Sequence, residues 1–266
     1  MPIINRTNQR PRIRPNQIAF TASQIWTVPT GIKRIDVFLV GGGGGPGGSH
    51  CYFYWGEGAE YRGVIYGGGS GGCGYTKTIK NVSVTPGQQI PVIVGTGGTA
   101  GLYFQVQGGV GSGGLYSVGT APSADSATNG SDGGASSFGS YSVLGGKGGY
   151  KFNYAGNNHG IGGAGGSGGG AGQLFNLYRT YGGQDQYTYN YGIGDFGTDG
   201  GNGQTVYYVS GGAGQGSTTR AFGEAGNTLY ASNGVTGANT GMGGISSGQG
   251  TANGAAGIVL VRWPQQ

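Results

Sequence analysis

The sequence contains few charged residues, few cysteines and no long apolar run, and each shortage excludes a class of protein. Charged residues make up 9% of the 266 residues. Two cysteines, Cys51 and Cys73, are too few for a disulfide framework. No stretch approaches the ~20 apolar residues of a membrane helix, and residues 1–20 lack the apolar run of a signal peptide. We therefore expect neither membrane insertion nor export by the ordinary secretion route.

Proline is also scarce, which excludes collagen despite the abundance of glycine. Collagen requires a strict Gly-X-Y repeat with much proline, whereas this chain has nine prolines beside 69 glycines. The glycines recur as Gly-Gly-X from Gly41, Gly68 and Gly162, in short blocks. Three residues per turn is the period of the left-handed polyproline II helix, and a glycine face lets such helices pack backbone to backbone. The pattern predicts a bundle of short polyglycine II helices.

Apolar residues make up 35% of the chain, which argues against disorder. Strand-like segments occur at residues 17–40, 74–95 and 257–263. In the first of them, Ile35, Val37 and Leu39 fall on one face of the expected strand. The last is nearly continuous in β-branched residues and predicts a central strand. The expected fold is all-β: a small β-sandwich packed with the polyglycine II bundle, and no α-helix.

Positive charge gathers in residues 1–16, which contain four arginines, three prolines and no acid. The arginines are Arg6, Arg10, Arg12 and Arg14. The rest of the chain is nearly neutral, with ten Lys and Arg against nine acids, and matches nucleic acid poorly. We predict that residues 1–16 form an extended arm that docks on a neighbouring protein. Residues 17–266 then form a single glycine-rich domain, with the bundle and its loops at 41–73 and 96–256.

Aromatic segments interrupt the glycine blocks, and we expect them to form loops at one end of the bundle. Tyrosine, asparagine and glycine loops on a rigid support resemble antibody loops, in which tyrosine offers large contact area with few rotatable bonds. The expected ligand is a glycan or a protein, and we leave that choice open. The residues expected to contact it are Tyr52, Phe53, Tyr54, Trp55, Tyr150, Phe152, Tyr154, Tyr178, Tyr181, Tyr187, Tyr189 and Tyr191. Three other tyrosines, Tyr103, Tyr116 and Tyr141, are expected to cover the bundle instead.

Catalytic patterns occur in the chain, but composition accounts for them. Two Gly-x-Ser-x-Gly matches, at Ser70 and Ser167, lack the following helix that a nucleophile elbow needs. The aspartates near the tyrosine-rich segment, Asp185, Asp195 and Asp199, are interpreted as turn residues rather than as a glycosidase pair. No pair among His50, Cys51, Cys73 and His159 has finger-like metal-ligand spacing. We predict a protein that is not an enzyme, with no catalytic residue, no metal and no cofactor.

Four sequence motifs, each made of one or two short segments, are fairly specific in combination. They are Trp26-Thr27-Val28-Pro29 with the strand ending at Val40, Val84-Thr85-Pro86-Gly87 with Val92-Ile93-Val94-Gly95, Gly133-Gly134-Ala135-Ser136-Ser137-Phe138-Gly139 with Gly145-Gly146-Lys147-Gly148-Gly149, and Ala256-Gly257 with Ile258-Val259-Leu260-Val261-Arg262-Trp263. Together they resemble the glycine-rich domain of bacteriophage tail-fibre and tail-tip proteins, over residues 18–263. That group includes adhesins whose distal domain is a polyglycine II sandwich.

The resemblance implies a virion protein in the tail or a surface appendage, which binds a host surface receptor through loops at one end of the bundle. The alternative is a structural or decoration protein whose glycine-rich domain contacts neighbouring subunits. The direction in which the tyrosine segments point distinguishes the two. Segments exposed at the outer tip favour adhesion, and segments buried between subunits favour assembly.

Overall fold

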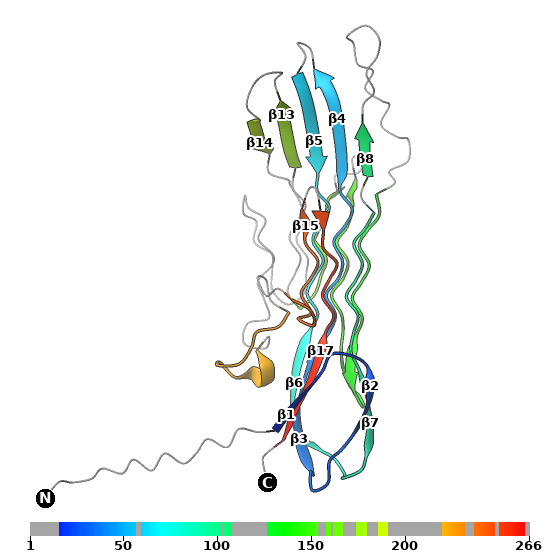
Figure 1. Ribbon diagram of the computed structural model, residues 1–266, viewed down its shortest axis with the longest axis vertical. Helices are drawn as coiled ribbons and strands as arrows, with labels where there is room; N and C mark the ends of the chain where they lie inside the picture. Colours follow the sequence, from blue (N-terminus) through cyan, green and yellow to red (C-terminus); the bar gives the residue numbers. More distant parts are fainter. Residues whose placement is uncertain are drawn as a thin grey trace, which may run out of the picture.

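The computed structural model describes residues 16–56, 60–102, 104–107, 127–153, 158–160, 162–166, 174–179, 186–190, 220–231, 237–247 and 250–263. Three parts follow one another along the long axis of the molecule (Figure 1). A β-sandwich lies at the lower end, glycine-rich segments run side by side through the middle, and a five-stranded sheet lies at the upper end. Strand β1 begins, and strand β17 ends, in the sandwich.

The sandwich consists of two antiparallel four-stranded sheets. The first has the order β1 (Asn16–Phe20), β17 (Ile258–Trp263), β3 (Arg34–Val40) and β6 (Thr76–Ser83). The second has the order β10 (Tyr141–Val143), β9 (Ser136–Phe138), β7 (Gln89–Ile93) and β2 (Gln24–Thr27). The all-β prediction is confirmed, since the described residues contain no α-helix and a single 3-10 turn, η2 (Ala221–Gly223). β17 has neighbours on both sides, as its β-branched sequence predicted.

Strands β9 and β10 correct the sequence analysis, which assigned residues 96–256 to the bundle and its loops. Each has three residues, too few to show an alternating pattern. Tyr141 begins β10 and packs against the sandwich core, so the prediction that it covers the bundle is wrong. The hydrophobic core lies between the two sheets. Every strand of the sandwich except β6 supplies a buried residue to it, and β6 adds half-buried side chains.

Strand β3 is buried on both faces, because a second segment covers the outer face of its sheet. Val37 and Leu39 point into the sandwich core, whereas Phe38 and Val40 join a smaller cluster outside it. Residues 220–231, here called the strap, contribute Ala221, Phe222, Tyr230 and Ala231 to that cluster, and Cys73, Met242, Ile258 and Leu260 complete it. Phe222 is fully buried at a left-handed φ of 58°, a conformation that tertiary packing has to maintain.

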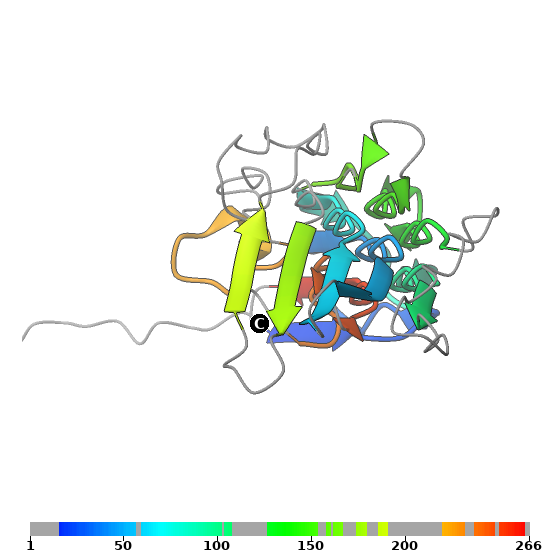
Figure 2. The ribbon, with the colours of Figure 1, turned by 90° about the horizontal axis from the view of Figure 1, so that it is seen from above.

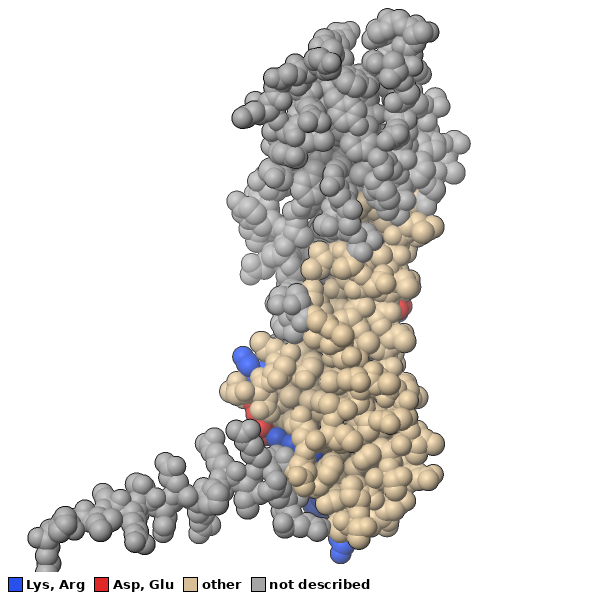
Figure 3. Space-filling view, in the orientation of Figure 1, with Lys and Arg blue, Asp and Glu red and all other residues tan. Residues whose placement is uncertain are grey.

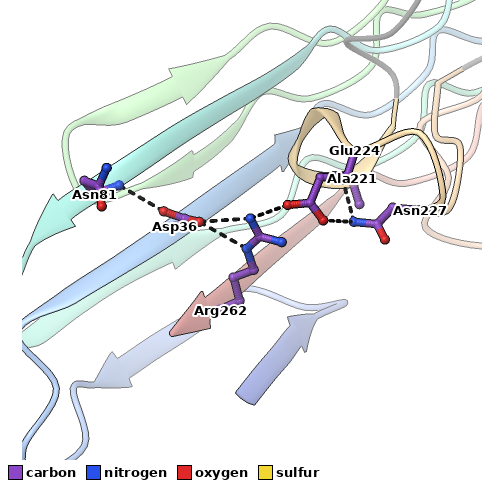
Figure 4. Close-up of polar contacts among 6 residues, drawn as sticks. All are labelled: Asp36, Asn81, Ala221, Glu224, Asn227 and Arg262. Atoms are coloured by element: carbon purple, nitrogen blue, oxygen red, sulfur yellow. Dashed lines mark hydrogen bonds and ion pairs between the residues drawn. The ribbon is translucent and has the colours of Figure 1, made fainter. Parts of the chain in front are cut away.

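A shared arginine fastens the strap to the sheet (Figure 4). Arg262 on β17 donates from Nε and Nη2 to Oδ2 of Asp36 on β3, at 3.1 and 3.0 Å. Its Nη2 also lies 2.7 Å from Oε1 of Glu224 in the strap. The guanidinium carbon sits 4.2 Å from the centre of the Phe222 ring, a cation–π arrangement. One cation thus neutralises two acids and packs on the aromatic ring of the strap.

Glycine-rich segments pack side by side around residues 41–49 and form a bundle, and residues 41–49 themselves are all buried. Backbone hydrogen bonds from this central segment repeat every third residue. Gly41, Gly44 and Gly47 donate to Tyr75, Gly72 and Gly69, while Gly42, Gly45 and Gly48 donate to Gly134, Ser131 and Thr128. Among the described residues, six segments contact it, at residues 68–74, 95–102, 128–134, 144–150, 241–245 and 252–257.

Viewed along the long axis, these segments stand side by side as small triangular coils (Figure 2). The period of three in the hydrogen bonds supports the polyglycine II conformation, which itself stays a prediction. Pro46 in the central segment is compatible with this prediction, because polyproline II has the φ angle that proline imposes. The buried backbone is satisfied between segments rather than within them.

Polar side chains accept hydrogen bonds from several backbone N–H groups at the surface of the bundle. Oδ1 of Asp132 accepts from the N–H of Gly148 at 2.9 Å, and Oδ1 of Asn253 accepts from that of Ala100 at 2.8 Å. Thr128 and Ser131 serve Leu102 and Thr99 in the same way. The residues between the glycines therefore complete the hydrogen bonding of the outermost segments.

A methyl group in the central segment should unfold or strongly destabilise the protein. A Cβ built on Gly44 would overlap the carbonyl of Lys147 in a neighbouring segment, and backbone has no rotamer by which to move away. We expect Gly44→Ala to cost at least about 3 kcal/mol of unfolding free energy in a denaturant melt. Gly226→Ala is the matched control, because a Cβ there meets nothing within 4 Å. Equal stability of the two variants would contradict the close packing.

The arginine contact should make the strap sensitive to acid. The hydrogen bond from Arg262 lowers the pKa of Glu224 below its usual value. A carboxyl whose pKa is lower in the folded state contributes its full stabilisation when the pH is above the pKa of the unfolded chain, ~4.3 for Glu. That contribution is lost as the pH falls through the folded-state pKa. We expect Glu224→Gln to be less stable than the parent at pH 7 by at most about 1 kcal/mol, because Glu224 is half exposed.

The difference between Glu224→Gln and the parent should vanish at acid pH, where the parent's Glu224 is protonated as well. Urea melts over a pH series measure this dependence directly. An undiminished difference below the folded pKa of Glu224 would show that the contact acts through shape rather than through charge.

Candidate functional site

The aromatic segments form a five-stranded sheet at the end of the molecule opposite the sandwich (Figure 1). Its order is β14 (Gln186–Asn190), β13 (Leu174–Arg179), β5 (Glu60–Tyr66), β4 (His50–Gly56) and β8 (Phe104–Gln107). All neighbours are antiparallel except β4 and β8, which are parallel. The predicted position at one end of the bundle agrees with the structure, but the prediction of loops is wrong. We call this element the tip sheet.

A physical reason favours strands here. Tyrosine, phenylalanine and tryptophan fit a pleated sheet well, and paired strands satisfy backbone groups that neighbouring loops would leave to water. The segments of the bundle also reach this end of the molecule already aligned side by side and close together. The central segment 41–49 continues directly into β4, and β5 continues directly into residues 67–74.

The register of the tip sheet aligns aromatic positions across four strands. One row joins Tyr187, Leu177, Gly63 and Phe53 on β14, β13, β5 and β4. The rows two residues away occupy the same face of the sheet, because successive positions in a strand alternate. These rows are Tyr189, Phe175, Ile65 and Cys51 on one side, and Arg179, Tyr61 and Trp55 on the other. We call this set the aromatic face.

The intervening rows define the opposite face, which is richer in polar residues. They are Gln186, Tyr178, Arg62 and Tyr54, then Thr188, Asn176, Val64 and Tyr52, then Asn190, Leu174, Tyr66 and His50. We call this set the mixed face. The run from Tyr52 to Trp55, whose residues were all expected to contact the ligand, is therefore divided between the two faces. The alternation of a strand imposes this division.

The remaining expected contact residues lie elsewhere. Tyr150 ends a bundle segment and is 51% exposed. Phe152 lies on β11 (Phe152–Asn153), which pairs with β12 (Asn158–His159), and a further small pair joins β15 (Ser246–Ser247) to β16 (Gly250–Thr251). Outside the described residues lie Tyr103, Tyr116, Tyr154, Tyr181, Tyr191, Ser167, Asp185, Asp195, Asp199, Arg6, Arg10, Arg12 and Arg14.

Strand β5 supplies three residues of the aromatic face and was missed in the sequence. Its segment carries Tyr61, Val64, Ile65 and Tyr66, residue types that favour strands. A search for β-rich runs without regard to the glycine blocks would have found it. The two elements that pair with it, β4 and β13, are remote in sequence from each other, so no local pattern could have joined them.

The structure locates the side chains of two of the residues weighed for catalysis or metal binding in the sequence, Ser70 and Cys73. Ser70 lies in a bundle segment, and its carbonyl accepts a backbone hydrogen bond from Gly163, so the Gly-x-Ser-x-Gly match there is not a strand-to-helix elbow. Cys73 is a free, buried thiol whose pKa is raised by burial, and its Sγ accepts from the N–H of Gly243 at 3.4 Å. Among these residues no three potential ligands gather to hold a metal ion. No described helix has the length and apolarity to cross a membrane.

Comparison with known sequences identifies the family but not a relative of known activity. No curated protein sequence matches the chain. The sequence profile of a family described as "Glycine-rich domain" matches residues 19–264, which include the bundle, the tip sheet and all of the sandwich except the first three residues of β1. The chain therefore belongs to the glycine-rich domain family.

Proposed function

We propose that the protein is a bacteriophage virion protein of the tail-fibre or tail-tip type, and that it binds a host surface receptor through the tip sheet. The aromatic tip sheet, held away from the sandwich by the glycine bundle, carries this proposal. The four motifs that resemble phage tail proteins support it. The receptor class stays a glycan or an outer-surface protein, since aromatic and amide side chains suit both.

The bundle makes a suitable support for a binding surface. Its central segment is fully buried, and its backbone is tied to its neighbours at every turn. A rigid support reduces the ordering cost that a flexible binding surface would have at contact. Tyrosines on such a support provide large area at low entropic cost.

The polarity of the molecule supports the same assignment of roles. The tip sheet lies at one end, and residues 1–15 join the sandwich at the other end, at Asn16 of β1. Asn16 pairs with Trp263, so the docking arm ends one residue earlier than the sequence suggested. In the proposed arrangement the arginine arm attaches the sandwich to the particle, and the tip sheet points outward.

The alternative function is a structural or decoration protein of the virion. The exposed apolar residues Leu102, Leu144 and Ile245 on the bundle favour it, because such residues along a shaft suit contact with a neighbouring subunit. In that case the tip sheet is buried within the particle. Binding to whole host cells separates the two functions.

The aromatic face should carry receptor binding. We expect the triple variant Phe53→Ala, Trp55→Ala, Tyr187→Ala to lose at least about tenfold in affinity for host cells, because aromatic residues dominate interface energies. The matched control is Tyr52→Ala, Tyr54→Ala, Tyr178→Ala, which removes three aromatic residues from the mixed face. Labelled protein and flow cytometry measure the binding, and melting temperatures show that both variants fold.

If the parent does not bind cells of a susceptible host, the assembly function is favoured instead. If both triple variants bind as the parent does, the tip sheet is not the binding surface. Loss confined to the mixed-face variant would assign receptor binding to that face and contradict the prediction.

A further inference from the structure

The edges of the sandwich sheets differ in how they are protected against pairing with another chain. Proteins protect sheet edges with lysines, bulges or short strands, because an open edge presents unpaired N–H and C=O groups. Strand β6 has two exposed lysines, Lys77 and Lys80, and a shift of register opposite β3. At this shift Asn81 adopts a left-handed φ of 57°, and its N–H bonds Asp36. β2 and β10 have only four and three residues.

Strand β1 is the exception among these edges. It is five residues long, with no charge, no proline and no break in register, and it pairs with β17 on one side. No other described strand pairs with it. Ile18 and Phe20 pack against the sandwich core and hold the strand in place, while Gln17 and Ala19 are exposed. The free edge of β1 is thus a rigid template for one more strand.

Positively charged residues occur at the start of β3 and in the sequence that precedes β1. Lys33 and Arg34 are exposed where β3 begins, and residues 1–15, with four arginines and no acid, lead into β1. The described acids at this end, Asp36 and Glu224, are already bonded to Arg262. Most of the Lys and Arg side chains visible in Figure 3 lie over the sandwich and the strap rather than over the bundle. An acidic partner would neutralise this charge.

We propose that the free edge of β1 binds an extended acidic segment of another protein by strand addition. Backbone hydrogen bonds along β1 would provide the pairing, and the neighbouring cations would select an acidic sequence. A second copy of the chain is a poorer occupant, because its own β1 sequence carries no acid to match the cations. The inference holds whether the tip sheet binds a receptor or a neighbouring subunit.

The experiment uses the full chain and a synthetic probe. The probe is a nine-residue peptide in which valine alternates with threonine, except that glutamate replaces three of the threonines. In the matched control peptide, lysine replaces the same three threonines. Fluorescence anisotropy measures affinity at about 50 mM and about 300 mM NaCl, across which surface charge is increasingly screened. Amide hydrogen exchange by NMR reports whether the N–H groups of residues 16–20 become protected.

Two variants separate edge pairing from charge. Ala19→Lys puts a lysine on the open edge strand, where lysine disfavours pairing with another strand. The same substitution adds a positive charge, which by itself would attract an acidic peptide. Thr27→Lys adds the same charge on β2 of the other sheet, at a position that is also exposed. We expect Ala19→Lys to weaken binding of the acidic peptide at least about tenfold, whereas Thr27→Lys leaves it unchanged or stronger.

Slowed exchange in β1 with the acidic peptide, together with the loss in Ala19→Lys, would support strand addition. The inference is overturned if the β1 N–H groups that face away from β17 are already protected in the free chain, if the lysine peptide binds as tightly, or if the two lysine variants behave alike. It is also overturned if sedimentation shows a dimer that Ala19→Lys dissociates, since the edge then binds a second copy. Cell binding by Ala19→Lys should equal that of the parent, which keeps this test separate from that of the tip sheet.

Discussion

The approach of bare glycine backbones to one another is the constraint on which the rest of this structure depends. The central segment has six neighbours, and its hydrogen bonds go to them rather than to itself. Any side chain on most of these glycines would overlap a carbonyl group of a neighbouring segment. The bundle therefore has almost no apolar side chains to bury, and its stability comes from satisfied backbone and close contact.

The sandwich gives the glycine segments their register. Strands β3, β7 and β10 each continue into a bundle segment, at residues 41–49, 95–102 and 144–150, while other segments lead into β6, β9 and β17. Glycine repeats alone could slide past one another by three residues without losing a hydrogen bond. The hydrophobic core fixes the strands, so sliding is prevented where the segments leave the sandwich. Ser136 reinforces this junction, since its Oγ donates to Val40 and accepts from Gly95.

The tip sheet stands at the other end of the same segments, so one framework positions two different surfaces. Its aromatic and mixed faces arise from the alternation of its strands rather than from the order of its residues. The sandwich end, in contrast, combines an open strand edge with positive charge. The two ends therefore suit different partners, and the proposed receptor contact and attachment contact do not compete for one surface.

The sequence by itself determined the local features: the sandwich strands other than β9 and β10, the period of the glycines and the absence of α-helix from the described residues. These depend on alternation or repetition within a few residues, as Val37, Phe38 and Leu39 show by facing opposite sides of one strand. Only the tertiary structure decided that β5 pairs with β13 as well as with β4, and that Tyr52 and Phe53 lie on different faces of the tip sheet. Tyrosine-, asparagine- and glycine-rich segments suit loops and strands almost equally, so the choice depends on the partners that the bundle brings beside them. Those partners are remote in sequence, and the backbone hydrogen bonds that join them leave no local pattern.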